Sequence, residues 1–512
     1  MKQIVHIFRK DVRRHWLEIL LSLATVAAFV WLEPRQWLPR DTLETRILEI
    51  VANSVEVVLV VSWGLLTARV VQGENLVGDR QFWVTRPYEW KKLLLAKLLF
   101  VIVFINAPLL VAQEVLLQRA GFGLTGSATW ALIGMQIGVL AICILPITAL
   151  ATVTSGIGQL LMALLAIAAY IAAAVGIASY VPSEGFSSGS DAVQEGLFVG
   201  VCLLAVIWQY ARRATTKTRV LLGAGAASIL IVVVATPYRT LVARQYPPVS
   251  SVQTPIMLAL ELAKPALRDG PPDKEESVNI RFPLIVSGIA QNSLVGLDGT
   301  MVAIDSRDGL HWNSGWKAKS SLLFPDDRRL QLDFEMPKAF FETVRATPVK
   351  VSISLAVKVF RDNEKKRTTA TEAEFAVPGV GQCAIQDALS NSLLCRFAIE
   401  SPRLVVMETS SSEIRCRGLE DQPVPPGRVA RGWDGKTDAG PISPIGTFGL
   451  SLWEWHDLPD SKATPRICPG TVLLFDRPEL VRAVGVKVDI PGVILADYKL
   501  DNTPTFTFRP TR

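Results

Sequence analysis

Long apolar runs constrain this chain more than any other feature. Residues 15–236 contain seven runs that are long enough, or nearly so, to cross a lipid bilayer, which requires about 20 apolar residues per helix. The hydrocarbon core offers no water to a free backbone group, so each run must be helical. The runs cover about 15–33, 49–71, 93–115, 129–152, 157–181, 195–211 and 219–236. We therefore expect an α-helical, multi-pass membrane bundle over residues 1–236.

The segment before the first run predicts an amphipathic helix over residues 3–16. Apolar residues recur every four positions on one face, and basic residues occupy the other: Ile4, Phe8, Val12 and Trp16 against Arg9, Lys10, Arg13 and Arg14. This pattern is typical of a helix that lies in the headgroup layer. The alternative is simple flanking charge for the first span. The first run leads to no small-residue cleavage site, so we expect it to remain as an anchor.

Lysine and arginine are distributed unevenly between the two sets of span ends. One set carries Lys2, Arg9, Lys10, Arg13 and Arg14, then Arg80, Arg86, Lys91 and Lys92, then Arg212, Arg213, Lys217 and Arg219; the other carries only Arg35, Arg40, Arg46 and Arg119 near the spans. Because basic residues accumulate on the cytoplasmic side, the N-terminus is expected to be cytoplasmic. Seven crossings then place everything after Tyr238 outside, in the periplasm of a bacterial inner membrane.

Between the second and third runs, Gln72–Lys97 has a distinctive order of residue types. An acidic residue is followed by a glycine-aspartate turn, a proline, a basic pair and a lysine at the start of the next run: Glu74, Gly78, Asp79, Arg86, Pro87, Lys91, Lys92 and Lys97. Pro87 restricts the preceding residue to extended conformations, so a short element is expected to end near Arg86 before a new helix begins. A bland alternative is a positive-inside loop of any multi-pass protein.

This order resembles the cytoplasmic connection of type-2 ABC exporter permeases, and the resemblance covers about residues 1–215. It implies that residues 72–92 form a coupling loop for a separate ATPase subunit, that ATP acts only through that partner, and that the permease pairs with itself or with a second permease. An elbow helix also precedes the first span in that family. Six spans and a cytoplasmic end would match the family, so the seventh run is a departure that we interpret as an added span exporting the C-terminal part.

Beyond the last run, residues 237–277 are rich in proline and charge and predict a stiff linker. Residues 278–512 then alternate apolar and other side chains with a period of two, most clearly at 349–359, and also at 278–286, 330–336, 448–452 and 484–490. Several short strands separated by turn residues favour a β-sandwich. We expect a periplasmic, mainly-β domain of one or two sandwiches, with a seam near Pro378-Gly379.

Four cysteines lie in this β-rich part: Cys383, Cys395, Cys416 and Cys468. In an oxidising compartment they allow three pairings. Proximity in the sequence favours Cys383–Cys395 with Cys416–Cys468. A zinc site is disfavoured because no CxxC pair occurs and histidines are scarce, so we expect no metal.

Within the second run, Glu56 is an ionisable residue at membrane depth, where it is costly and needs a partner or water. It could line a substrate path or fix helix packing through Ser54 or Ser62; the alternative is a protonated or snorkelling side chain. Pro108 and Pro146 lie inside spans and are expected to kink them, because each removes a backbone hydrogen bond.

Catalytic and nucleotide-binding signals are weak. Residues 185–189 fit the G-x-S-x-G hydrolase motif but lie in a short loop between two spans, without the strand and helix that the motif requires. Gly435-Lys436-Thr437 resembles part of a phosphate-binding loop, with Ala430 in place of the first glycine. We therefore expect no enzyme activity, no directly bound cofactor and no catalytic residues in this chain. The basic residues flank the membrane and do not indicate a nucleic-acid-binding module.

The sequence thus predicts a permease-type subunit of an ABC exporter that a separate ATPase energises by alternating access. A membrane-anchored scaffold or sensor that acts through its periplasmic β domain is the alternative. Replacing Glu74, Arg86, Lys91 and Lys92 together would disable the first and leave the second intact.

Overall fold

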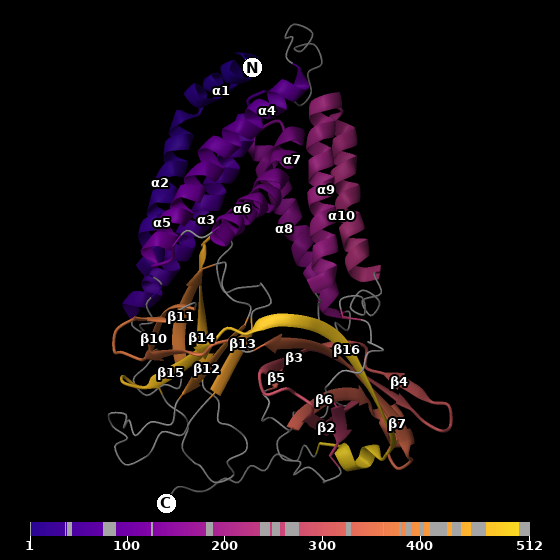
Figure 1. Ribbon diagram of the computed structural model, residues 1–512. Coiled ribbons are helices and arrows are strands. Elements are labelled where there is room, and N and C mark those ends of the chain that lie inside the picture. Colours follow the sequence, from indigo (N-terminus) through magenta and orange to yellow (C-terminus); the bar gives the residue numbers. More distant parts are fainter. Residues whose placement is uncertain are drawn as a thin grey trace, which may run out of the picture. The chain divides into compact units, whose positions relative to one another are not determined.

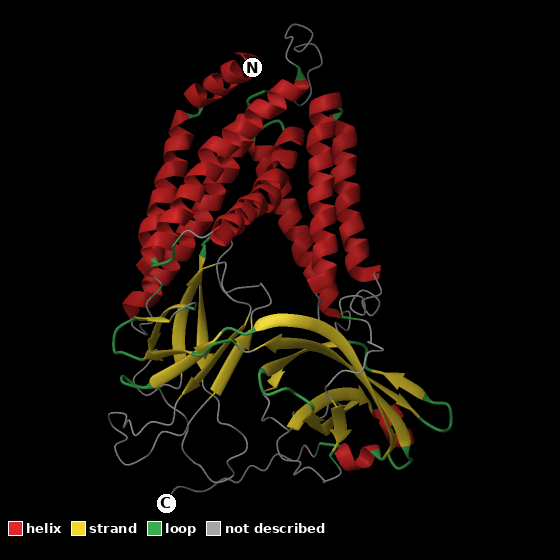
Figure 2. Ribbon diagram, viewed as in Figure 1, coloured by secondary structure: helices red, strands yellow, loops and turns green. Residues whose placement is uncertain are grey.

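A computed structural model describes the fold. It describes residues 2–35, 37, 43–74, 89–123, 126–180, 188–235, 246–247, 257–261, 276–323, 329–361, 363–377, 380–385, 392–398, 404–409, 428–432, 442–451 and 467–500. Helices make up the N-terminal part of the chain and strands the C-terminal part, as the predicted fold class requires (Figures 1 and 2).

In the described residues of the helical part, the α-helices follow the order α1 (Lys2–Arg14), α2 (Trp16–Leu32), α3 (Leu43–Gln72), α4 (Trp90–Val101), α5 (Ala107–Arg119), α6 (Gly126–Gly138), α7 (Leu145–Val153), α8 (Ile157–Tyr180), α9 (Ser188–Arg212) and α10 (Thr215–Ala235). A short 3₁₀ segment, Glu33–Arg35, follows α2. The predicted amphipathic helix at residues 3–16 is α1. Its packed face centres on Ile7 and Asp11, whereas Trp16 is exposed and begins α2.

Six of the described helical stretches are long and apolar enough to cross a membrane: Trp16–Arg35, Ile50–Gln72, Trp90–Arg119, Ala128–Val153, Gln194–Arg212 and Thr215–Val232. The run at 157–181, the fifth of the seven spans expected from the sequence, forms α8. Its stretch with described side chains, Ile157–Ala173, is a shorter apolar helix. The structure thus shows a membrane-type bundle with six such helices among the described residues.

The two long spans that contain prolines change helical type just before the proline. A π-helical segment, Ile102–Asn106, joins α4 to α5, and another, Val139–Ile144, joins α6 to α7. Pro108 and Pro146 lie at the starts of α5 and α7. A proline lacks the N–H that would bond the carbonyl four residues earlier, which here falls inside each π-helical segment. A π-helical segment therefore precedes each proline, and the kinks expected at these positions stay predictions.

The strands form a mainly-β region with several sheets. In chain order they are β1 (Met257–Leu260), β2 (Ser277–Ser287), β3 (Ser293–Asp305), β4 (His311–Asn313), β5 (Lys317–Leu323), β6 (Arg329–Pro337), β7 (Val349–Arg361), β8 (Lys366–Thr369), β9 (Phe375–Val377), β10 (Gly381–Ile385), β11 (Ser392–Ala398), β12 (Leu404–Thr409), β13 (Arg428–Gly432), β14 (Ile445–Ser451), β15 (Val472–Asp476) and β16 (Glu479–Val493). A short helix, α12 (Lys338–Val344), separates β6 from β7.

One set of strands makes the first β domain, which comprises β1–β7, α12 and β16. Its sheets have the orders β1-β2-β6 and β16-β7-β3-β4, with β5 paired to β3, and all pairs are antiparallel. Alternate residues of β2, β6 and β7 fill one shared core, including Ile280, Phe282 and Ile353. The period of two in the sequence therefore identified the buried faces of these strands correctly.

A stretch expected to be linker contributes to this domain. Met257–Leu260, within residues 237–277, pairs with Leu284–Ser287 of β2, and Leu258 and Leu260 pack against the core. Most other residues of the expected linker lie outside the described part of the chain.

The remaining strands, β8–β15, make the inserted β domain, because they lie in the sequence between the paired strands β7 and β16. The sheet orders are β14-β11-β10-β9 and β13-β12-β15-β8. Residues of both sheets, such as Cys395 and Phe475, share one core, as in a sandwich. The chain divides into compact units at 363/364 and 477/478, whereas Pro378-Gly379, the expected seam, lies outside the described residues.

The inserted β domain belongs to the same compact unit as the helices, which covers residues 1–181, 192–235 and 364–477. Ala398, Ile442 and Ile445 of this domain join the apolar core of the helix bundle, alongside Trp63, Phe100 and Leu109. The other unit covers residues 182–191, 236–363 and 478–512. The sequence gives no sign that half of the β region packs directly on the membrane helices.

Candidate functional site

A cluster of four charged side chains, of which Lys10 is exposed and the other three are buried, lies where α1 meets α4 and the end of α3. The Lys97 ammonium lies 2.7 Å from Asp11 Oδ2 and 3.3 Å from Glu74 Oε1, and the Lys10 ammonium lies 3.2 Å from the same Glu74 oxygen. Asp11, Glu74 and Lys97 are 2%, 7% and 4% exposed. Two cations and two anions balance one another. Such a buried set is retained only because every charge is paired.

Three elements meet at this cluster. Lys10 and Asp11 belong to α1, Glu74 lies two residues beyond the end of α3, and Lys97 is in α4. The Arg14 guanidinium adds a 3.3 Å hydrogen bond to the Gly73 carbonyl. Gly73 and Glu74, which follow α3, and Lys97 of α4 are therefore all held to α1.

Apolar packing holds α1 against α4 beside the charges. The Phe8 ring stacks on Phe104 at a centroid distance of 5.8 Å, and Phe100 lies 4.9 Å from Phe104. Aromatic pairs of this kind contribute about 0.5–1.5 kcal/mol beyond their buried area. In Figure 1, α1 lies beside the start of α4 at one end of the bundle. The elbow-like helix is thus a fixed part of the bundle.

Electrostatics favours the ionised form of Glu74. Burial alone would raise the pKa of the Glu74 carboxyl, but the Lys97 and Lys10 ammonium groups outweigh it and hold this pKa below its usual range. Burial lowers the pKa of His15, which follows α1, and the nearby Glu18 offsets part of that effect. At neutral pH Glu74 is therefore a carboxylate and His15 is neutral.

The structure separates the residues of the predicted coupling loop into two kinds. Glu74 and Lys97 are internal, whereas Lys91 is exposed and Lys92 is half-buried. The Lys92 ammonium lies 2.8 Å from Glu89, and that of Lys91 lies 5.7 Å from the centroid of the Trp90 ring. Gly78, Asp79, Arg86 and Pro87 lie outside the described residues.

Asp11 and Lys10 belong to the cluster but did not stand out as site residues in the sequence. A usable signal exists for Asp11, since it is the first acidic residue of the chain and lies among basic ones. On the predicted amphipathic helix it falls beside Ile7 and Phe8, on the face that packs. An acid on the apolar side of a helix requires a cation, and Lys97 is that cation.

Glu56 is half-buried in α3. The two hydroxyls proposed as its partners bond to the backbone of their own helix, since Ser54 donates to the Ile50 carbonyl and Ser62 to that of Leu59. Ser62 also lies 3.3 Å from the Thr25 hydroxyl of α2. Both serine hydroxyls therefore donate within their own helix, and the role of Glu56 stays a prediction.

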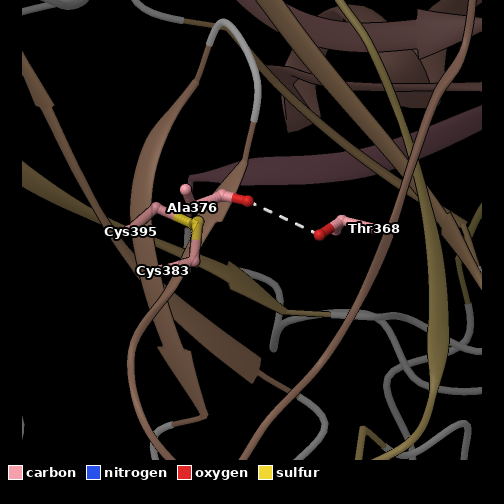
Figure 3. Close-up of a disulfide and its surroundings, with 4 residues drawn as sticks. All are labelled: Thr368, Ala376, Cys383 and Cys395. Carbon is pink, nitrogen blue, oxygen red and sulfur yellow. Dashed lines mark hydrogen bonds between the residues drawn. A yellow bond between two sulfur atoms is a disulfide. The ribbon is translucent and has the colours of Figure 1, made fainter.

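A disulfide joins Cys383 and Cys395, directly opposite each other on β10 and β11 (Figure 3). This is the pair that proximity favoured. Nearby, the Thr368 hydroxyl of β8 donates to the Ala376 carbonyl of β9 at 3.5 Å, linking the two sheets of the inserted β domain. Cys468 is also disulfide-bonded, and Cys416 lies outside the described residues. In the part of the chain that the structure describes, no three His, Cys, Asp or Glu side chains are grouped to hold a metal ion.

Comparisons with known proteins identify no family. No protein-family model matches the chain, and no curated protein matches it. Among solved structures, red sea bream transglutaminase aligns at 10% identity over 56% of this chain and 35% of its own, with a TM-score of 0.14. The structure titled pT26-6p aligns at 8% identity over 41% of this chain and 61% of its own, with a TM-score of 0.10. Likenesses this low support no conclusion about fold or function.

Proposed function

We propose that the chain is the membrane-spanning subunit of an exporter and that a separate ATPase subunit energises it by docking on the segment around residues 72–92. The buried cluster of Asp11, Glu74 and Lys97 is the observation that carries this proposal. A loop without contacts to the helices would bend when the ATPase moves against it, and it would not transmit that movement. A segment whose two flanks are fastened to α1 transmits the movement to α3 and α4, because all three elements must move together.

Exposed charge supplies the docking chemistry. Lys91 and Lys92 lie at the start of α4, where Lys91 is exposed and Lys92 is half-buried. Exposed charges affect partner choice and association rate more than fold stability. We therefore assign contact with the ATPase to Lys91, Lys92 and the undescribed Arg86, and mechanical coupling to Glu74 and Lys97.

For the topology we propose seven crossings, in which α8 crosses the membrane together with the six helical stretches named above. The 24-residue α8 is about 36 Å long at 1.5 Å per residue, enough for a bilayer core of about 30 Å. The Tyr170 hydroxyl donates to the Ala226 carbonyl at 2.6 Å, and both residues lie near the middle of their helices. The Arg219 guanidinium donates to the Val153 carbonyl and ties the start of α10 to the end of α7, where α8 begins soon after. Hence α8 and α10 start at the same end and run in the same direction.

On this topology the end that carries α1 is cytoplasmic, and the β domains are periplasmic, in a bacterial inner membrane. The disulfide at Cys383–Cys395 is consistent with an oxidising compartment. Lipid or a second permease subunit, identical or not, would cover the exposed apolar side chains of the spans, such as Leu20, Val57 and Ile137.

Affinity purification from native membranes in mild detergent, with mass spectrometry of the bound proteins, tests the proposal. The expected result is a stoichiometric soluble ATPase that is lost from the double variant Lys91→Glu/Lys92→Glu. The matched control is Arg212→Glu/Lys217→Glu, which reverses two exposed charges on the same predicted face but away from the segment. Repeated recovery of intact protein without an ATPase would contradict the exporter proposal and would favour a membrane-anchored scaffold that acts through its β domains.

A further inference from the structure

The segment Ile442–Ile445, which leads into β14, is buried in the end of the helix bundle. Ile442, Ser443 and Ile445 are each at most 3% exposed, although they belong to a β domain. Ile442 and Ile445 are members of the bundle core that also contains Leu109 and Leu116 of α5. These four residues, Ile442 to Ile445, are called the plug segment below.

Two hydrogen bonds from the bundle hold the plug segment. Gln113 Nε2 of α5 donates to the Ile442 carbonyl at 2.8 Å. The Ser443 hydroxyl donates to Glu33 Oε1, just beyond α2, at 2.5 Å. Gln113 is fully buried and Glu33 is 7% exposed. Both contacts lie in a largely apolar setting, so losing them when the plug segment is displaced would be costly.

A chain of buried amides continues from the plug segment into the bundle. Gln136 Nε2 of α6 donates to Gln113 Oε1 at 2.8 Å, and Asn106 Nδ2 donates to Gln136 Oε1 at 2.8 Å. The donors thus run in one direction, from Asn106 through Gln136 and Gln113 to the Ile442 carbonyl. Because three neutral amides at membrane depth are tolerated only when bonded to one another, they form a single coupled set.

Two members of this chain, Asn106 at its start and Gln136 in its middle, adjoin the π-helical segments. Asn106 is the last residue of Ile102–Asn106, and Val139–Ile144 begins three residues after Gln136. A π-helical turn has one residue more per hydrogen-bonded ring than the helix around it, so it is a place where a helix can change register. A movement that returned either segment to α geometry would rotate Asn106 or Gln136 and break the amide chain.

We propose that the plug segment is a gate that closes this end of the bundle, and that the amide chain Asn106–Gln136–Gln113 couples its release to rearrangement of the two π-helical segments. This proposal rests on the proposed transport function, because the gate would close the periplasmic end of the path along which the exporter moves its substrate. ATPase docking at the α1 end would move α4, and with it Ile102–Asn106.

Thiol labelling tests the gate without requiring transport. Leu109→Cys is placed beneath the plug segment, in full-length protein whose free cysteines are removed (Cys143→Ala, Cys202→Ala), and a membrane-impermeant maleimide is added to intact spheroplasts. The expected result is little labelling while the plug segment is seated and at least tenfold faster labelling when Gln113→Met and Ser443→Ala release it. Equal labelling rates in the seated and released forms, whether both slow or both fast, would overturn the gate.

A control position separates this outcome from failure of the proposed function. Gln118→Cys, exposed near the end of α5, should react from outside in every variant. Reaction of Gln118→Cys only after the cells are opened would show that the orientation is wrong, whereas Leu109→Cys would still report on the plug in opened vesicles. If the double variant Gln113→Met/Ser443→Ala is not a single species in size-exclusion chromatography, Ser443→Ala alone replaces it as the milder variant. An unchanged labelling rate of Leu109→Cys in Ser443→Ala would then contradict the gate.

Discussion

The Lys97 ammonium lies 2.7 Å from the Asp11 carboxylate although the two residues are separated by 86 positions in the chain. Both are almost fully buried, at 4% and 2% exposure. The pair joins the helix that precedes the first span to the helix that begins the third. It therefore fixes α1 to the bundle more specifically than apolar packing could, because only one seating of α1 neutralises both charges.

Lys97→Met should destabilise the protein strongly, because Asp11 would remain buried without a cation. Removing one partner of a buried pair costs about 3–5 kcal/mol. Asp11→Asn/Lys97→Met, which removes both charges, should recover much of that loss. Unfolding measured in detergent for the wild type, both single variants and the double variant gives the coupling energy. Additive losses in this cycle would show that the two side chains do not depend on each other.

Acidification should weaken the fold through His15. Burial lowers the pKa of this imidazole below its ordinary 6.5. The unfolded chain therefore takes up a proton first as the pH falls below about 6.5, so the stabilisation is complete above that pH and is lost as the pH falls toward the folded-state pKa. The limiting slope is about 1.4 kcal/mol per pH unit. Unfolding at pH 7.5 and 5.5 should show a smaller pH effect in His15→Gln than in the wild type; equal effects would contradict this origin.

Local periodicity predicted much of the fold. The spacing of Ile280, Phe282 and Leu284 identified the buried face of β2, and the length of the apolar runs identified the membrane helices. Periodicity is a property of one element and does not reveal its partner. Thus the pairing of β7 with β16 across an intervening domain, and the burial of Ile442 in the helix bundle, could not be inferred from the sequence.

The candidate site was predicted in part, for a related reason. Glu74 and Lys97 stood out because they flank one segment, whereas Asp11 lies far away in the sequence and was assigned to neither face of the predicted amphipathic helix. Whether a charged residue can contact the ATPase or instead links α1 to α3 and α4 depends on whether its side chain is exposed or buried. Lys91 and Lys97 look alike in the sequence, and only the fold shows that one is exposed and the other enclosed.

Loss of the disulfide in the inserted β domain should be measurable in the whole protein. Cys383 and Cys395 close a loop with a sequence separation of 12, and the entropy of such a loop corresponds to about 3 kcal/mol. Cys383→Ala/Cys395→Ala should therefore lower the unfolding midpoint and speed protease cleavage within residues 364–477. Cys143→Ala/Cys202→Ala, which removes the two thiols that are free among the described residues, should leave that cleavage rate unchanged. A disulfide-free variant cleaved as slowly as wild type would refute the expectation.

Gly299 in β3 should not tolerate a side chain while Tyr246 is present. A Cβ at this position would collide with the Tyr246 ring, which stacks on Trp316 at a centroid distance of 4.4 Å. Gly299→Ala must displace the ring and should cost about 1–3 kcal/mol, as overpacking does. Comparison of Gly299→Ala in the wild type and in Tyr246→Ala tests the cause. The alanine should be nearly harmless once the ring is gone, and an unchanged cost would point to the backbone of β3 instead.

Substitutions at Lys91 and Lys92 should affect ATPase binding, whereas a substitution at the buried Lys97 should affect stability. Lys91→Glu/Lys92→Glu changes exposed or half-buried charges, so its effect on unfolding should stay within about 0.5 kcal/mol, while the ATPase should no longer co-purify. Lys97→Met should show the reverse order, with a large loss of stability and, in the fraction that remains folded, an ATPase still bound but unable to drive transport. Binding and ATP-driven export measured on the same monodisperse samples distinguish the two. Loss of the ATPase from folded Lys97→Met would mean that the buried cluster shapes the docking surface itself, because α4 would then no longer present Lys91 and Lys92 in the orientation that the partner recognises.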